Sequence, residues 1–262
     1  MEQLLVGRFN IFVFLIVVLL FGTMLLALEL GFRLGRRHRS GGETQIEGLG
    51  TLEGGVLGLM GLLLAFTFSG AASRFDERRR LIVEEANMMG TSWLRIDLLP
   101  AEAQPAIRDS FRSYVDARIE AFASLPDYQK AVAAMGRADA LQGVIWKQAV
   151  AATYGGWPAA ATVVLPSLNE LFDITTTRKF ATKTHPPPMI YVLLGVLVLM
   201  SSLLAGYGMS SNSKRRWSHI FAFLVMVSLT LWTIMDLEYP RLGVIRVDAF
   251  DQAIVDVRSA MK

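Results

Sequence analysis

Four long apolar segments limit this chain to one broad class of fold. A helix needs about 20 apolar residues to cross the ~30 Å hydrocarbon core of a bilayer. Backbone groups in lipid must bond to one another, so segments of this kind cross as helices. The sequence therefore predicts an all-α, polytopic membrane protein, in agreement with its 53% hydrophobic composition and mean hydropathy of +0.41. The predicted spans are residues 11–28, 54–72, 189–209 and 219–235.

The spans form two pairs separated by a long polar stretch. Residues 1–73 hold the first transmembrane pair, and 74–188 are predicted to form an extramembrane helical block. Residues 189–236 hold the second pair, and 237–262 form a C-terminal tail.

Three helices are predicted inside the block. Apolar residues recur at steps of three and four in the first, as on one face of a helix: Ile107, Phe111, Tyr114, Val115, Ile119 and Phe122. Residues 127–153 and 168–180 are the second and third. The prolines at 186–188 break the chain before the third span.

The second span passes into charged sequence without a turn. The stretch "GLLLAFTFSGAASRFDERRRLIVEEANMMG", residues 61–90, contains no proline, which predicts one helix from about residue 54 to 98, stopped by Pro100. One face of it carries only small residues: Gly54, Gly58, Gly61, Ala65, Ser69 and Ala72. Small residues let membrane helices approach closely, so this face is expected to join copies of the chain in a homo-oligomer.

The same face is a candidate pore lining, with Phe66 and Phe68 as a hydrophobic constriction. The alternatives are plain helix packing for the small residues, within or between subunits, and lipid contact for the two phenylalanines. Small-residue stripes serve packing more often than they line pores.

Charged residues crowd the exit of this span. Two ion pairs at helical spacing are expected, Glu77 with Arg80 and Arg80 with Glu84. Arginines ringed around a symmetry axis would attract anions to a pore mouth, whereas the alternative is a solvated helix face. The candidate residues of this exit are Arg74, Arg78, Arg79, Arg80, Glu84, Glu85, Asn87 and Arg95.

Carboxylates also stand at the ends of other spans. Asp236 ends the fourth span and is expected to pair with Arg241 or Arg246, or to act as a site carboxylate at membrane depth. Glu29 and Arg33 have the i,i+4 spacing of an anchoring pair.

The orientation of the spans has evidence on both sides. Basic residues in short loops mark the cytoplasmic side, and the two short linkers hold Arg33, Arg36, Arg37, Arg39, Lys214, Arg215 and Arg216. This favours cytoplasmic linkers and an external block. The opposite side is also basic near the span ends, with Arg74, Arg78, Arg79, Arg80, Arg178, Lys179, Lys183, Arg241 and Arg246.

Several chemistries lack residues to support them. The chain has no cysteine, and His38, His185 and His219 lie far apart without metal-ligand spacing. Hydrolase, P-loop and dinucleotide motifs are missing, so no enzyme activity, metal or cofactor is predicted. The net charge of +3 reflects basic residues beside the spans, which favours a membrane partner over nucleic acid.

The stretch from "FTFSGAASRFDERRR" to "IDLLP" and the later "DLEYPRLGVIRV" resemble a large bestrophin-like family of bacterial membrane proteins of unknown function. The match follows the chain in order and spacing. It is carried by Ser69, Arg74, Arg79, Glu84, Glu85, Ala86, Asn87, Gly90, Thr91, Arg95, Leu99, Pro100, Asp236, Pro240, Arg241, Gly243 and Arg246.

Resemblance to bestrophins implies a pentameric anion channel with four spans per subunit and a cytosolic helical block. The bestrophin neck carries an Ile-Pro-Phe-Phe-Phe run, whereas the corresponding segment here reads "LLLAFTFSG", without proline. The acidic calcium clasp of bestrophins has no counterpart in this sequence.

The sequence therefore predicts one of two functions. The first is an oligomeric channel in the bacterial inner membrane, with preference for small anions and a pore near the second span. The second is a non-conducting scaffold or sensor that acts through its helical block. The expected partners are the lipid bilayer, further copies of the chain and small anions.

Overall fold

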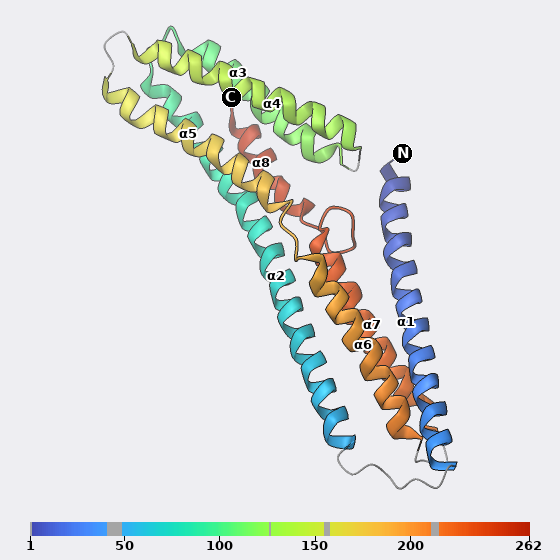
Figure 1. Ribbon diagram of the computed structural model, residues 1–262. Helices are drawn as coiled ribbons and strands as arrows, with labels where there is room; N and C mark the ends of the chain where they lie inside the picture. The colour runs from blue at the N-terminus through green and yellow to red at the C-terminus, as the bar shows by residue number, and fades with distance from the viewer. Residues whose placement is uncertain (1, 41–48, 126, 155–157, 211–214) are drawn as a thin grey trace. The chain divides into compact units, whose positions relative to one another are not determined.

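The computed structural model describes residues 2–40, 49–125, 127–154, 158–210 and 215–262. These residues form eight α-helices and one 3₁₀ helix, with no β-strand among them (Figure 1). The all-α prediction is confirmed. The elements are α1 (Glu2–Ser40), α2 (Leu49–Arg95), η1 (Ile96–Leu98), α3 (Gln104–Ala123), α4 (Tyr128–Thr153), α5 (Pro158–Ala181), α6 (Pro188–Met209), α7 (Trp217–Glu238) and α8 (Asp248–Ala260).

The chain folds into two compact units. The first, called the apolar unit below, comprises Arg8–Ser73 and His185–Tyr239. The second, called the helical block, is built mainly from Arg74–Thr184 and Pro240–Lys262. Helix α2 contributes to both units.

Four helices are long and apolar enough to cross a membrane: α1 over Ile11–His38, α2, α6 and α7. These are the four predicted spans. Helix α1 continues to Ser40, so Arg33, Arg36 and Arg37 lie on its last turns rather than in a linker. The helix therefore continues beyond residue 28, where the predicted span ends, and its contact with α6 extends along these turns.

Glycines make that contact between α1 and α6. A Cβ atom at Gly31 would collide with the backbone carbonyl of Leu203, and one at Gly206 would collide with that of Leu28. Gly35 lies equally close to Ser210. Close backbone approach through small residues is typical of membrane helices, and here it joins the first span to the third.

Helix α2 runs for 47 residues without interruption. The junction between lipid-like and charged sequence lies inside it, so the prediction of one continuous helix is confirmed. The helix tightens into η1 after Arg95 and ends before Pro100, as the fixed φ of proline and its missing N–H require.

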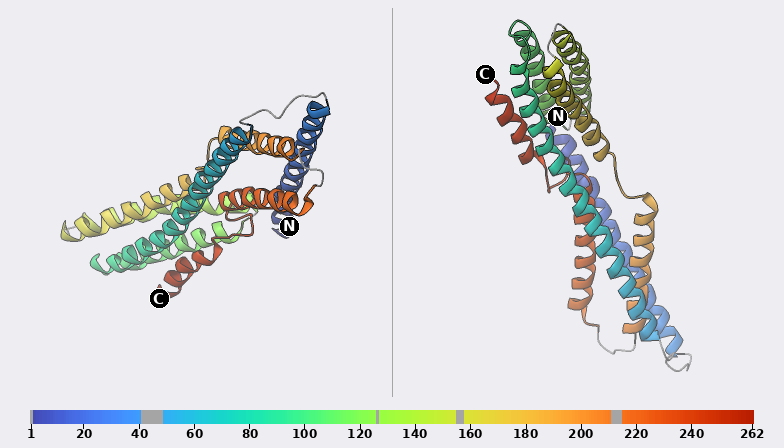
Figure 2. Two further views of the ribbon diagram at one scale, coloured as in Figure 1. Left: turned by 90° about the horizontal axis from the view of Figure 1, so that it is seen from below. Right: turned by 90° about the vertical axis from the view of Figure 1, so that its left-hand side faces the viewer.

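The helical block centres on α3 and α4, which lie side by side and antiparallel (Figures 1 and 2). The predicted apolar face of α3 is buried at Ile107, Phe111, Tyr114 and Val115. Helix α4 begins where Asp127 accepts a hydrogen bond from the backbone N–H of Lys130 at 3.2 Å, a standard N-cap.

Two features of the block differ from the sequence prediction. Helix α5 starts at Pro158, ten residues before the predicted start at 168, and contains Pro166. Buried Val164 and Leu168 on either side hold this stretch against the block, so packing outweighs the missing hydrogen bond of the proline. The C-terminal tail also contains an unpredicted helix, α8.

Candidate functional site

Helix α2 buries one stripe along most of its length. Buried side chains recur at steps of three and four residues, which places them on one face. They are Met60, Leu64, Thr67, Ala71, Phe75, Arg78, Ile82, Glu85, Met89, Ser92 and Ile96. The stripe is largely apolar in the span, and it takes in an arginine and a glutamate in the charged half.

The predicted small-residue face lies elsewhere on the helix. Its first five members, from Gly54 to Ser69, are exposed, and Ala72 is half-buried. A Cβ atom at Gly54, Gly58 or Gly61 would meet no described atom within 4 Å. The described chain therefore makes no close contact at these glycines, and its close backbone approach through glycine is between α1 and α6.

The two phenylalanines of the span also face outward. Phe66 is 67% exposed and Phe68 is 42% exposed, whereas Thr67 between them is buried. The Thr67 hydroxyl donates to the carbonyl of Leu63 at 2.7 Å. Phe68 lies closer than Phe66 to the small-residue face, because successive residues turn by about 100° around a helix.

The arginines at the exit of the span have different surroundings. Arg78 is 5% exposed, and its guanidinium donates to the carbonyls of Ala181 and Thr184 at 3.1 and 3.0 Å. It thus satisfies backbone acceptors at the end of α5, where free carbonyls favour a cation. Arg79 lies over the ring of Phe250, 4.6 Å from its centre, and Arg74 is half-buried.

Arg80 is the exposed member of this group. It forms the two predicted ion pairs, with Glu77 at 2.8 Å and with Glu84 at 3.0 Å. Its side chain is 62% exposed, so solvent screens both pairs and each contributes little to stability.

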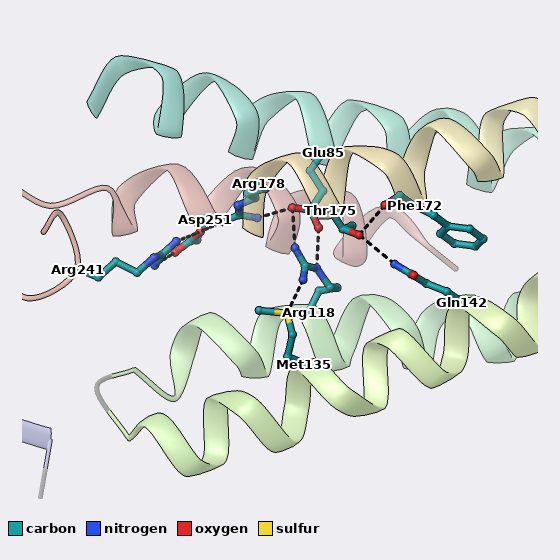
Figure 3. Close-up of polar contacts among 9 residues, drawn as sticks. All are labelled: Glu85, Arg118, Met135, Gln142, Phe172, Thr175, Arg178, Arg241 and Asp251. Carbon is teal, nitrogen blue, oxygen red and sulfur yellow. Dashed lines mark hydrogen bonds and ion pairs between the residues drawn. The ribbon is translucent and has the colours of Figure 1, made fainter. Parts of the chain in front are cut away.

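Glu85 is the centre of a buried ion network (Figure 3). Both of its carboxylate oxygens accept from Arg118 of α3, at 2.7 and 2.9 Å. Arg178 of α5 donates to the same carboxylate at 2.6 Å and to Asp251 of α8 at 3.0 Å. Arg241 completes the chain with two bonds to Asp251, at 2.7 and 3.0 Å. One carboxylate of α2 is therefore tied to α3 and α5 directly and to α8 through Arg178.

An aromatic ring lies at the middle of the same network. The guanidinium carbons of Arg178, Arg241 and Arg118 lie 3.8, 4.7 and 5.0 Å from the centre of the Phe122 ring. The negative face of a ring attracts cations, and guanidinium groups stack on it well. Phe122 thus provides a cation–π contact to each of the three guanidinium groups of the network.

Burial and the charge of Glu85 shift the pKa values of Arg118 and Arg178 in opposite directions. Burial alone would lower the pKa of Arg118, but the charge and the hydrogen bonds of Glu85 together outweigh it, and the net effect is a raised pKa. Burial lowers the pKa of Arg178, and the nearby charge of Arg118 adds to this against the opposing effect of Glu85. Burial, followed by the Glu85 charge, also raises the pKa of Tyr114, which keeps the neighbouring phenol neutral.

The remaining predicted residues are spread over both units. Asn87 is exposed on α2, and Arg95 donates to the carbonyl of Val163 at 3.2 Å. Asp236 is 1% exposed near the end of α7. Arg241 and Arg246 pair with Asp248 of α8, a helix that the sequence prediction did not include. Glu29 pairs with Arg33 as expected, at 2.7 Å, and also with Arg215.

A family model described as the Bestrophin-like domain matches residues 18–249. The match takes in α1 from residue 18, the whole of α2, α6 and α7, and the members of the Glu85 network up to Arg241. The chain belongs to the Bestrophin-like family. Among curated proteins no sequence matches it.

Solved structures show the same fold. A tyrosine-to-alanine variant of a bacterial bestrophin homolog from Klebsiella pneumoniae aligns with a TM-score of 0.65 and 15% identity, over 94% of this chain and 98% of that one. A proline-to-alanine variant described as a membrane protein aligns with a TM-score of 0.61 and 15% identity, over 93% of this chain and 98% of that one.

In this Bestrophin-like chain, sequence reasoning found Glu85 but not most of the residues that surround it. Arg118, Phe122 and Asp251 are 33 or more positions away along the chain, so no helical spacing relates them to Glu85. One signal was present: Arg118 lies on the buried side of α3, next to Val115 and Ala121. An arginine in an apolar stripe requires a buried carboxylate as partner.

Proposed function

We propose that this Bestrophin-like protein is an oligomeric, multi-pass channel of the bacterial inner membrane that prefers small anions. Its pore would lie near α2, with the small-residue face at the junction between copies. The observation that supports this most directly is the empty space beside Gly54, Gly58 and Gly61. A Cβ atom added to any of them would meet no described atom within 4 Å. Family membership supports conduction over a catalytic role.

The anion preference rests on the cations that follow the span. Arg78 is buried against the end of α5, so it contributes through structure rather than through contact with ions. Arg79 and Arg80 have side chains that are 40% and 62% exposed and are the better candidates. Positive charge at a pore mouth raises the local concentration of anions.

A flux assay in liposomes tests this proposal. The purified protein should pass chloride faster than sodium, and Arg79→Glu/Arg80→Glu should lower the chloride-to-sodium ratio by about tenfold or more. Arg80→Glu alone should lower it in the same direction, and it leaves the contact of Arg79 with Phe250 intact. Arg137→Glu reverses the charge of an exposed arginine on α4 and should leave the chloride-to-sodium ratio unchanged.

Two results would contradict the proposal. Zero flux in every gradient and at every pH would favour the non-conducting scaffold or sensor. If the double variant conducts with an unchanged chloride-to-sodium ratio, the two arginines do not lie on the conduction path.

A further inference from the structure

Basic residues gather at one end of the apolar unit. The end of α1, the end of α6 and the start of α7 meet there (Figure 1). Contacts confirm the meeting, since Glu29 of α1 pairs with Arg215 at 2.7 Å and Gly35 lies against Ser210. The described basic residues of this cluster are Arg33, Arg36, Arg37, Arg215 and Arg216.

Aromatic rings hold part of the cluster in place. The guanidinium of Arg215 stacks over the buried ring of Phe32 at 3.7 Å and lies 5.5 Å from the ring of Trp217. Arg36 lies over Phe32 as well, at 5.8 Å. Trp217 is 46% exposed, and tryptophan at the end of a span is typical of the membrane–water interface.

Positive charge exceeds negative charge at this end. Its described carboxylates are Glu29, which is shared by Arg33 and Arg215, and Glu53, which lies beside Gly208. The five described arginines of the cluster therefore outnumber the two described carboxylates.

The place of the cluster along the helices indicates its partner. The charge-free stretch of α1 ends at Leu28, ahead of the cluster, and α7 begins at Trp217, directly after Arg215 and Arg216. The cluster therefore flanks the apolar stretches of two spans, where a membrane protein meets the headgroup layer. Arginine side chains at that depth extend into the headgroup layer. Phosphate groups fill this layer, and arginine binds phosphate through two parallel hydrogen bonds.

The favourable effect of a helix C-terminus on cations explains arginines on the last turns of α1. It does not explain why Arg215 and Arg216, at the start of α7, are at the same place. There the helix N-terminus disfavours positive charge. Glu29 supplies a counter-charge for Arg215, so Arg216 is the residue for which an added anion would be favourable.

We propose that this cluster binds the headgroup of an anionic phospholipid. Arg36, Arg37 and Arg216, all exposed, would contact the phosphate. Arg215 would be a positioning residue, held by Glu29, Phe32 and Trp217. The proposal does not depend on conduction, because lipid binding is measured without flux.

Native mass spectrometry of the full-length protein, released from detergent with added lipid, tests the proposal. The protein should retain phosphatidylglycerol in preference to phosphatidylcholine. Arg36→Gln/Arg37→Gln should weaken retention of phosphatidylglycerol about thirtyfold, at about fivefold for each arginine. The matched control Lys130→Gln/Arg137→Gln removes two exposed charges from α4 and should retain the lipid as the wild type does.

Equal retention of the two lipids, or full retention by the double variant, would overturn the proposal. Competition by inorganic phosphate at millimolar concentration would also overturn it, since it would assign the cluster to a free anion. If the double variant fails to fold, Arg216→Gln provides the same test at a single position, with an expected loss of about fivefold.

Discussion

At the scale of single residues, Glu85 is the buried carboxylate that links three helices of the helical block. It is fully buried and forms ion pairs with both Arg118 and Arg178. In Glu85→Gln the buried Arg118 would lose its counter-charge and Arg178 would keep only Asp251, and removing one partner of a buried pair costs about 3–5 kcal/mol. Thermal or denaturant unfolding in detergent measures the loss.

The neighbouring Glu84 provides the control for this prediction. It pairs with exposed Arg80 on the surface of the same helix, so Glu84→Gln should cost less than about 1 kcal/mol. Equal stability of the two variants would mean that the network around Glu85 contributes no more than a surface pair.

The same residues show where sequence reasoning stops. The pairs of Arg80 were predictable because they lie three and four positions apart on one helix. The partners of Glu85 were not predicted, since they come from α3 and α5 and depend on how three helices pack. Local spacing carries information about local pairs alone.

At the scale of elements, the contact between α1 and α6 gives the sharpest prediction. Gly206→Ala would place a methyl group against the carbonyl of Leu28, and backbone cannot yield as a flexible side chain does. Overpacking of this kind costs about 1–3 kcal/mol. A fall in the thermal unfolding temperature of the apolar unit would measure it.

Gly195 is the matched control on the same helix, because an added Cβ there meets no described atom within 4 Å. Gly195→Ala should be neutral or slightly stabilising, since alanine favours helix more than glycine does. A loss in Gly195→Ala equal to that in Gly206→Ala would show that helix propensity, and not close approach, decides the outcome.

Elements were predictable where one strong pattern determines them. Four apolar stretches gave the four spans, and the lack of proline between residues 61 and 90 gave the continuous α2. The predicted start of α5 at residue 168 was ten residues too late, because the helix runs through Pro166 with Val164 and Leu168 buried on either side. Helix α8 was missed although Ile254 is buried and Asp248 and Asp251 stand in its first turn, a favourable place for acidic residues.

At the scale of the whole molecule, the open face of α2 predicts how copies assemble. The described chain fills no space next to Gly58 and Gly61, so Gly58→Leu and Gly61→Leu should leave each subunit folded. In the oligomer the same leucines would separate helices that approach through small residues. We therefore expect native mass spectrometry to show a lower oligomeric state for either variant, with near-native unfolding of the subunit.

Gly195→Leu is the control for this prediction, because Gly195 is equally open but lies on α6. It should keep the oligomer of the wild type. If all three leucine variants keep that oligomer, the small-residue face of α2 faces lipid instead of a second copy. A pore along this face would then be excluded, because no other subunit would line it. If Gly195→Leu alone lowers the oligomeric state, subunits meet through α6, and the search for the conduction path moves to that helix.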